Sequence, residues 1–144
     1  MIEAMIVVAL LGILAAVALP SFLDSVRKGR RSEAVAALAQ VQQAQERWRA
    51  NHSAYTTALT TAAPDGLGLA SVSSGGLYDI RIDAASGSGY TATASAVSGK
   101  SQSHDSLCST LRVRMAGGNV QYGGCGGCEL TDSALTDPNR CWSR

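Results

Sequence analysis

The sequence predicts an α+β protein in which a long N-terminal α-helical spine carries a C-terminal antiparallel β-sheet of about four strands on its second half. Three observations lead to this prediction. An apolar run without charge occupies residues 4–23, apolar positions recur at helical spacing as far as Trp48, and short segments after residue 76 alternate apolar with polar residues. Spacing of three and four residues indicates a helix, whereas a period of two indicates strands with one buried face.

The apolar run at residues 4–23 is about 20 residues long, which is enough to cross the hydrocarbon core of a bilayer as one helix. Positive charge follows it, at Arg27, Lys28, Arg30 and Arg31. The positive-inside rule alone would therefore leave the rest of the chain in the cytoplasm. A secretory signal peptide would instead begin with basic residues, and this chain has an acidic one. The run predicts a membrane segment that fits neither common pattern.

Three residues in or beside this run are unusual for a membrane helix. Glu3 places a costly carboxylate at the edge of the apolar segment, so it requires either a cationic partner or a solvated position among the lipid headgroups. Gly12 costs a helix about 1 kcal/mol relative to Ala, and Pro20 removes a backbone hydrogen bond. We therefore expect local unwinding of the helix between Gly12 and Pro20.

The helical pattern continues beyond the apolar run. Small, apolar or amide side chains recur at alternating spacings of four and three residues, at Ala34, Leu38, Val41, Gln45 and Trp48. This spacing gives the second half of the helix one face for burial. Over residues 1–51 the helix would be roughly 75 Å long, far more than a bilayer requires. The second half is therefore expected to pack under the sheet.

The remainder of the chain divides into an irregular connection and a strand-rich region. Residues 52–76 are rich in Thr, Ala, Ser and Gly and contain a Pro-Asp-Gly turn signal. Strands are expected from the alternation of Tyr78, Ile80 and Ile82, and over residues 90–97, 111–115 and 120–122. These segments predict an antiparallel meander with one face covering the helix.

All four cysteines lie after residue 107, at Cys108, Cys125, Cys128 and Cys141. An even, clustered set behind an export-like N-terminus indicates disulfides that form in an oxidising compartment. Three pairings are possible, and residue spacing does not choose among them. The Cys125-x-x-Cys128 motif could be a redox pair or half of a zinc site, but its flanking glycines and the lack of a following helix favour a structural bridge.

Charge and motif content support no enzymatic class. The net charge is +1, which is not the basic footprint of a nucleic-acid-binding protein. The three triad residue types stand in a row at residues 104–106, but catalytic triads are assembled from separated positions, so we expect Asp105 to lie in a solvated turn. No Gly-rich phosphate loop and no paired carboxylates stand out. No catalytic residue, metal site or cofactor is predicted.

The N-terminal stretch MIEAMIVVALLGILAAVALPSF resembles the mature N-terminus of type IV pilins of the IVa type, because the acidic residue, the Gly and the Pro fall at the family's spacing. The resemblance implies the pilin fold. It implies that Glu3 pairs with the N-terminal amine of a neighbouring subunit, and that the helix melts between Gly12 and Pro20 in the filament. It also implies a periplasmic head, against the charge rule. Met1 would stand at the family's third mature position, so the leader peptide and the first two mature residues, including the methylated Phe, are absent from the chain as given.

The C-terminal region also resembles pilins, in which a disulfide brackets a segment called the D-region. The resemblance implies a pairing of Cys108 with Cys141, which would leave Cys125 with Cys128. The expected organisation has five parts. A hydrophobic membrane or filament-core helix (1–25) leads into an amphipathic helix packed on the head (26–51) and a connecting loop (52–76). The sheet (77–124) and an overlapping D-region (108–144) follow.

The function implied by the resemblance is that of a structural subunit, not an enzyme. It would be anchored in the inner membrane, be processed by the prepilin peptidase, and polymerise with copies of itself through the assembly machinery into an extracellular helical pilus for twitching motility, adhesion or DNA uptake. Whether it binds DNA stays open. The alternatives are a type II secretion pseudopilin, whose major form typically has a calcium site and no C-terminal disulfide, and a membrane-tethered binding module that does not polymerise.

Overall fold

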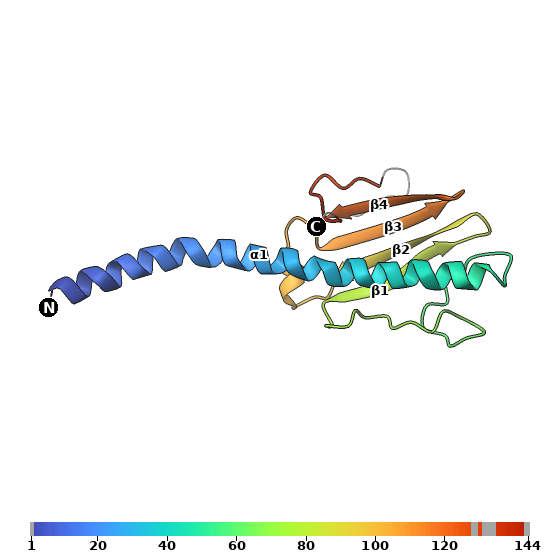
Figure 1. The fold of residues 1–144 in the computed structure, drawn as a ribbon, viewed down its shortest axis with the longest axis horizontal. Coiled ribbons are helices and arrows are strands. Elements are labelled where there is room, and N and C mark those ends of the chain that lie inside the picture. The colour runs from blue at the N-terminus through green and yellow to red at the C-terminus, as the bar shows by residue number, and fades with distance from the viewer. Residues whose placement is uncertain (1, 128–129, 131–134, 143–144) are drawn as a thin grey trace.

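The structure, a computed structural model, describes residues 2–127, 130 and 135–142. It consists of one long helix and a four-stranded sheet laid against the second half of that helix (Figure 1). The predicted α+β architecture is confirmed. The elements in chain order are α1 (Ile2–Arg49), β1 (Tyr78–Ala85), β2 (Gly89–Ala96), the short 3₁₀ helix η1 (Ser101–His104), β3 (Thr110–Ala116) and β4 (Asn119–Cys125).

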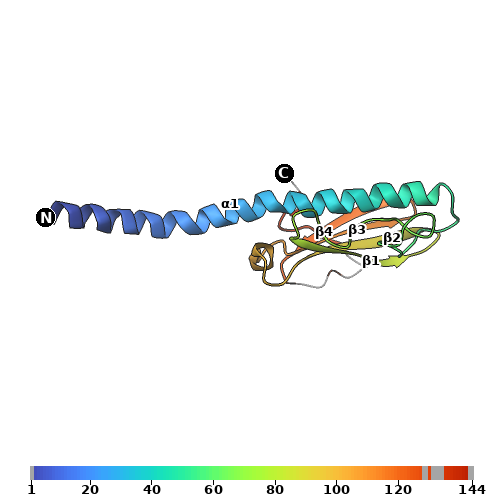
Figure 2. The same cartoon turned by 90° about the horizontal axis from the view of Figure 1, so that it is seen from below.

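Helix α1 is continuous over its 48 residues. Its first half projects from the head, and its second half runs along one face of the sheet (Figure 2). At 1.5 Å per residue the helix is about 72 Å long. Gly12 and Pro20 both lie inside the continuous helix of this single chain. The local unwinding expected from these two residues is not present in the single chain. The melting that the resemblance implies for the assembled filament stays a prediction.

The sheet is a simple antiparallel meander in the order β1-β2-β3-β4. Inward-facing residues lie opposite one another across it, as in the pair Ile80 and Ala94 and the pair Ala92 and Val113. Because side chains alternate between the two faces of a strand, this register gathers the apolar residues on the face that meets α1. The four predicted strands are confirmed. Burial alternates at the start of β1 and β3, whereas β2 is buried on both faces over most of its length and Val120 and Tyr122 in β4 are exposed.

The core lies between α1 and this inner face of the sheet. The helix contributes the predicted face, with Ala34, Leu38, Val41 and Gln45 each almost completely buried. The sheet contributes buried side chains that include Tyr78, Ile80, Ala92, Ala94, Leu111 and Val113. The modest size of many of these residues allows the helix to approach the sheet closely.

A polar side chain of α1 anchors the connection that leaves the helix. The fully buried amide of Gln45 donates to the carbonyl of Thr56 at 2.6 Å and accepts from the Thr56 backbone N–H at 3.2 Å. Nearby, the indole N–H of Trp48 donates to the carbonyl of Ala54. The connection contains no helix and only an isolated bridge at Val72, so these bonds satisfy backbone groups that no ladder reaches.

Candidate functional site: the projecting helix and the base of the head

The projecting half of α1 presents an uncovered apolar surface. Each of its large apolar side chains with a described position is between 50% and 75% exposed. These are Ile2, Met5, Ile6, Val7, Val8, Leu10, Leu11, Ile13, Leu14, Leu19, Phe22 and Leu23. Exposed apolar patches of this extent are unfavourable in water and mark surfaces that another molecule covers. This half is therefore the first part of the candidate site.

Among the described residues, α1 is the one helix long and apolar enough to span a membrane. Glu3 lies in its first turn, where a carboxylate interacts favourably with the helix dipole. Within the described part of the chain Glu3 takes part in no ion pair. Its pairing with the amine of another subunit therefore stays a prediction.

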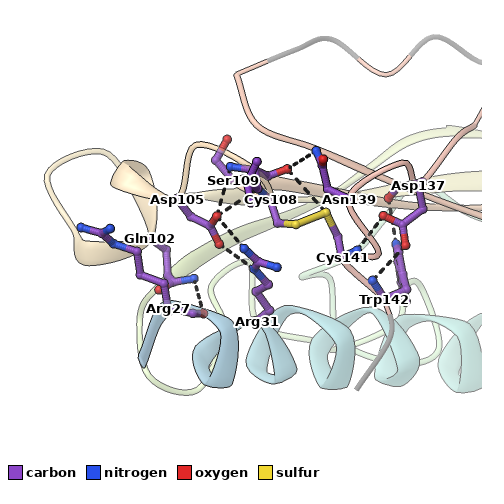
Figure 3. Close-up of a disulfide and its surroundings, with 12 residues drawn as sticks. Arg27, Arg31, Gln102, Asp105, Cys108, Ser109, Asp137, Asn139, Cys141 and Trp142 are labelled. Atoms are coloured by element: carbon purple, nitrogen blue, oxygen red, sulfur yellow. Dashed lines mark hydrogen bonds and ion pairs between the residues drawn. A yellow bond between two sulfur atoms is a disulfide. The ribbon is translucent and has the colours of Figure 1, made fainter. Parts of the chain in front are cut away.

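A buried ion pair fastens the head to α1 where the helix enters it (Figure 3). Arg31 donates from Nε and Nη2 to the two carboxylate oxygens of Asp105, at 2.7 and 2.8 Å. Both side chains are at most 10% exposed. The Asp105 carboxylate also accepts the backbone N–H groups of Leu107 and Cys108. One carboxylate therefore joins the helix to the turn that leads into Cys108.

The environment of Asp105 favours its charged form. Burial by itself would raise the pKa of the Asp105 carboxyl, but the hydrogen bonds and charge of Arg31, with the two backbone N–H groups, outweigh burial and lower the pKa. The expectation of a solvated turn is wrong for Asp105. The sequence did contain a signal, because Arg31 precedes Ala34 by three residues and so continues the buried face of α1.

A second contact connects η1 to both the helix and the sheet. The buried Gln102 amide nitrogen donates to the carbonyl of Arg27 at 3.2 Å and to the Tyr78 hydroxyl at 2.8 Å. Burial raises the pKa of Tyr78, although the Gln102 contact opposes the shift. The Tyr78 hydroxyl thus stays neutral and links strand, 3₁₀ helix and α1 in one hydrogen-bonded chain.

The disulfide between Cys108 and Cys141 is present, with Cα atoms 5.6 Å apart and both residues buried, which confirms the first implied pairing. Asp137 holds the C-terminal side in place by accepting the backbone N–H groups of Cys141 and Trp142. Cys128 lies outside the described residues, so the pairing with Cys125 stays a prediction. The observed bridge ties the end of the chain to the turn that Asp105 attaches to α1.

A groove of about 720 Å³ lies between α1 and this C-terminal segment. Its helical wall includes the small residues Gly29, Ser32 and Ala36, which follow one another at spacings of three and four and therefore share one face. The opposite wall includes Trp142, whose ring centroid lies 4.6 Å from the ring centroid of Tyr122. Small residues on a helix allow another helix to approach closely, so the groove extends the candidate assembly surface into the head.

Metal-binding side chains do not gather in the described part of the chain. No group of three or more His, Cys, Asp or Glu side chains there could hold a metal ion. The site is instead a bare apolar helix, braced at its entry into a disulfide-closed head. Such an arrangement suits assembly with other helices or insertion in a bilayer.

A long, half-exposed α1 that supports an antiparallel sheet and a C-terminal disulfide defines a type IV pilin. Residues 20–112 match the family described as type IV minor pilin ComP, DNA uptake sequence receptor, and the chain belongs to this family. The match includes the covered half of α1, β1, β2 and η1. No curated protein matches the sequence.

Proposed function

We propose that this protein is a minor subunit of a type IV pilus that is stored in the inner membrane, enters the filament through the projecting half of α1, and takes part in DNA uptake. The observation that carries the proposal is the bare apolar half of α1 in a chain of the pilin family. A bilayer can cover this half before assembly, and helices of neighbouring subunits can cover it afterwards.

The head supports the same role by transmitting load to the helix. Arg31 and Asp105 tie the helix to the disulfide-closed turn, and Gln102 ties it to the sheet. A subunit held in a fibre only by its helix needs such a connection, because force on the head would otherwise separate the head from its anchor. The groove beside Ala36 gives a neighbouring helix a place to pack.

The DNA-uptake part of the proposal comes from the family, which is described as a DNA uptake sequence receptor. The net charge of +1 gives no general attraction for DNA, so we expect binding through a local cluster of cations and not through the whole surface. Binding of the full chain to duplex DNA should therefore weaken steeply as salt rises.

The test is to delete the gene, complement it with a tagged full-length chain, and analyse surface fibres released by shear. We expect the tagged protein in the fibres at a low ratio to the main subunit, and we expect uptake of labelled DNA to fall at least tenfold in the deletion strain while fibres persist. Complementation should restore uptake.

Other outcomes separate the alternatives. Loss of protein secretion with normal fibres would indicate a type II secretion pseudopilin. Absence of the tagged chain from fibres, together with a monomer in detergent, would indicate a membrane-tethered module. Normal DNA uptake in the deletion strain, with the protein present in fibres, would contradict the DNA-uptake role and leave adhesion or motility.

A further inference from the structure

Basic residues follow the apolar run of α1 closely. Arg27, Lys28, Arg30 and Arg31 lie within eight positions of Leu23, the last residue of that run. At about 100° per residue, Arg27 and Arg31 share one face of the helix, and Lys28 and Arg30 point to either side of that face. The four cations therefore lie on one half of the helix, close to the point where it leaves the apolar segment.

Two of these cations are already neutralised. Arg27 pairs with Asp24 at 2.9 Å, and Arg31 pairs with the buried Asp105. Lys28 and Arg30 are exposed and form no ion pair within the described part of the chain. The positive charge that remains available at this level is therefore that of Lys28 and Arg30.

The head adds a third cation at the same level. Arg30 donates to the hydroxyl of Ser101 at 2.6 Å, which fixes the start of η1 beside α1. Lys100, the residue before Ser101, is exposed and also forms no ion pair within the described residues. Figures 1 and 2 show η1 at the end of the head that faces the projecting helix. We call Lys28, Arg30 and Lys100 the cationic collar.

The backbone of the collar lies just beyond a lipid headgroup layer, within reach of long side chains. Lys28 and Arg30 lie about 7.5 and 10.5 Å along the axis beyond Leu23 at 1.5 Å per residue. The headgroup layer extends roughly 5 to 7 Å beyond the hydrocarbon core on each side. Helical side chains lean toward the N-terminus of their helix, so the long side chains of Lys28 and Arg30 incline back toward the membrane.

We propose that the cationic collar binds the phosphate groups of anionic phospholipids at the outer face of the inner membrane and holds the head against the bilayer before assembly. This inference rests on the membrane-anchored state in the proposed function. It explains why uncompensated cations gather at the exit of a membrane helix, and it gives the basic residues a role on the side that the positive-inside rule disfavours. Phosphates of DNA are the competing ligand.

The test uses the full chain in bilayers of phosphatidylcholine that contain 30% phosphatidylglycerol, with spin-labelled lipids as the probe. We expect wild-type protein to immobilise labelled phosphatidylglycerol at least threefold more strongly than labelled phosphatidylcholine, and 0.5 M NaCl to reduce this preference. The collar variant K28Q/R30Q/K100Q should show nearly equal association of the two lipids. The control R47Q/R49Q/R81Q removes the same charge elsewhere on the chain and should keep the wild-type preference.

A single substitution at Lys28 tests whether misfolding of the triple variant causes the loss of lipid preference. Lys28→Gln removes no hydrogen bond or ion pair of the described residues and should lower the preference by about half. An unchanged preference in both the triple variant and Lys28→Gln overturns the proposal. So does a collar variant that loses binding to a short DNA duplex while it keeps its lipid preference. If no lipid is immobilised by wild-type protein, the chain is not in the bilayer and the anchored state itself is contradicted.

Discussion

The two halves of α1 belong to one continuous helix but differ in how their apolar surface is covered. In the first half, large apolar side chains are exposed on every side, as Leu14 is at 66%. In the second half, Leu38 is completely buried under the sheet, and charged residues occupy the outer faces. The more apolar half is thus the uncovered one. Its cover must come from outside the chain, whereas the second half is covered by its own head.

The contacts that stabilise the head are separate from the surface that anchors the protein. The buried half is fixed by the core, by the Arg31–Asp105 pair and by the disulfide loop. The projecting half contacts none of these. Substitutions in the two halves should therefore have separable effects, on assembly in one case and on stability in the other.

The largest effect is expected from Leu14→Asp. A carboxylate near the centre of the apolar run costs roughly 2.5 to 3.5 kcal/mol on insertion, so we expect loss of the protein from membranes and from fibres. The free energy of unfolding of the head should equal that of the wild type.

The matched substitutions are Leu14→Ala and Leu38→Ala. The first should leave the stability of the head unchanged, and the second should lower it by about 3 kcal/mol because it leaves a cavity. Urea unfolding followed by Trp fluorescence measures both.

Removal of the disulfide should give the largest effect on the stability of the head itself. The bridge closes a loop with a sequence separation of 33. In the chain-entropy model, such a loop contributes about 4 kcal/mol to the free energy of unfolding. We expect the double variant C108S/C141S to lose this amount in urea unfolding while it still fractionates with membranes. An unchanged midpoint would show that other contacts already order the C-terminal segment.

Asp105→Asn should destabilise the head by about 3 kcal/mol, because it leaves the buried Arg31 guanidinium without its counter-charge. The control is Asp24→Asn, which breaks the Arg27 pair at a carboxylate that is 68% exposed. Exposed pairs contribute little, so this change should stay below about 1 kcal/mol. Equal losses in the two variants would contradict a special role for the buried pair.

The smallest effect is the dependence of head stability on pH. Because the folded pKa of Asp105 is lowered, the unfolded chain binds its proton more readily. The contribution of Asp105 is therefore complete above the ordinary carboxyl range and is lost as the pH falls below about 4 toward the folded value. Below pH 4, the free energy of unfolding should fall more steeply with decreasing pH for the wild type than for Asp105→Asn. Parallel pH profiles would refute this.

Much of the fold could be predicted because one physical signal dominates each element. The apolar run and the spacing of Ala34, Leu38 and Val41 determine α1, and alternation determines the strands. The buried role of Asp105 was missed because a polar tripeptide in a loop gives no local sign of a distant partner. The groove beside Trp142 depends on how the C-terminal segment folds back, which no periodicity describes.

The difference between the two halves of α1 can be measured directly by photo-cross-linking in intact, piliated cells. A photoreactive residue is placed at Leu14 in the projecting half or at Gln43, an exposed position in the covered half. We expect the probe at Leu14 to cross-link to lipid in unassembled protein and to the apolar helix of another pilin in fibres, while the probe at Gln43 forms neither the lipid adduct nor that cross-link. Cross-links from position 14 to the protein's own head, or reaction of that probe with water alone, would contradict an externally covered first half of α1.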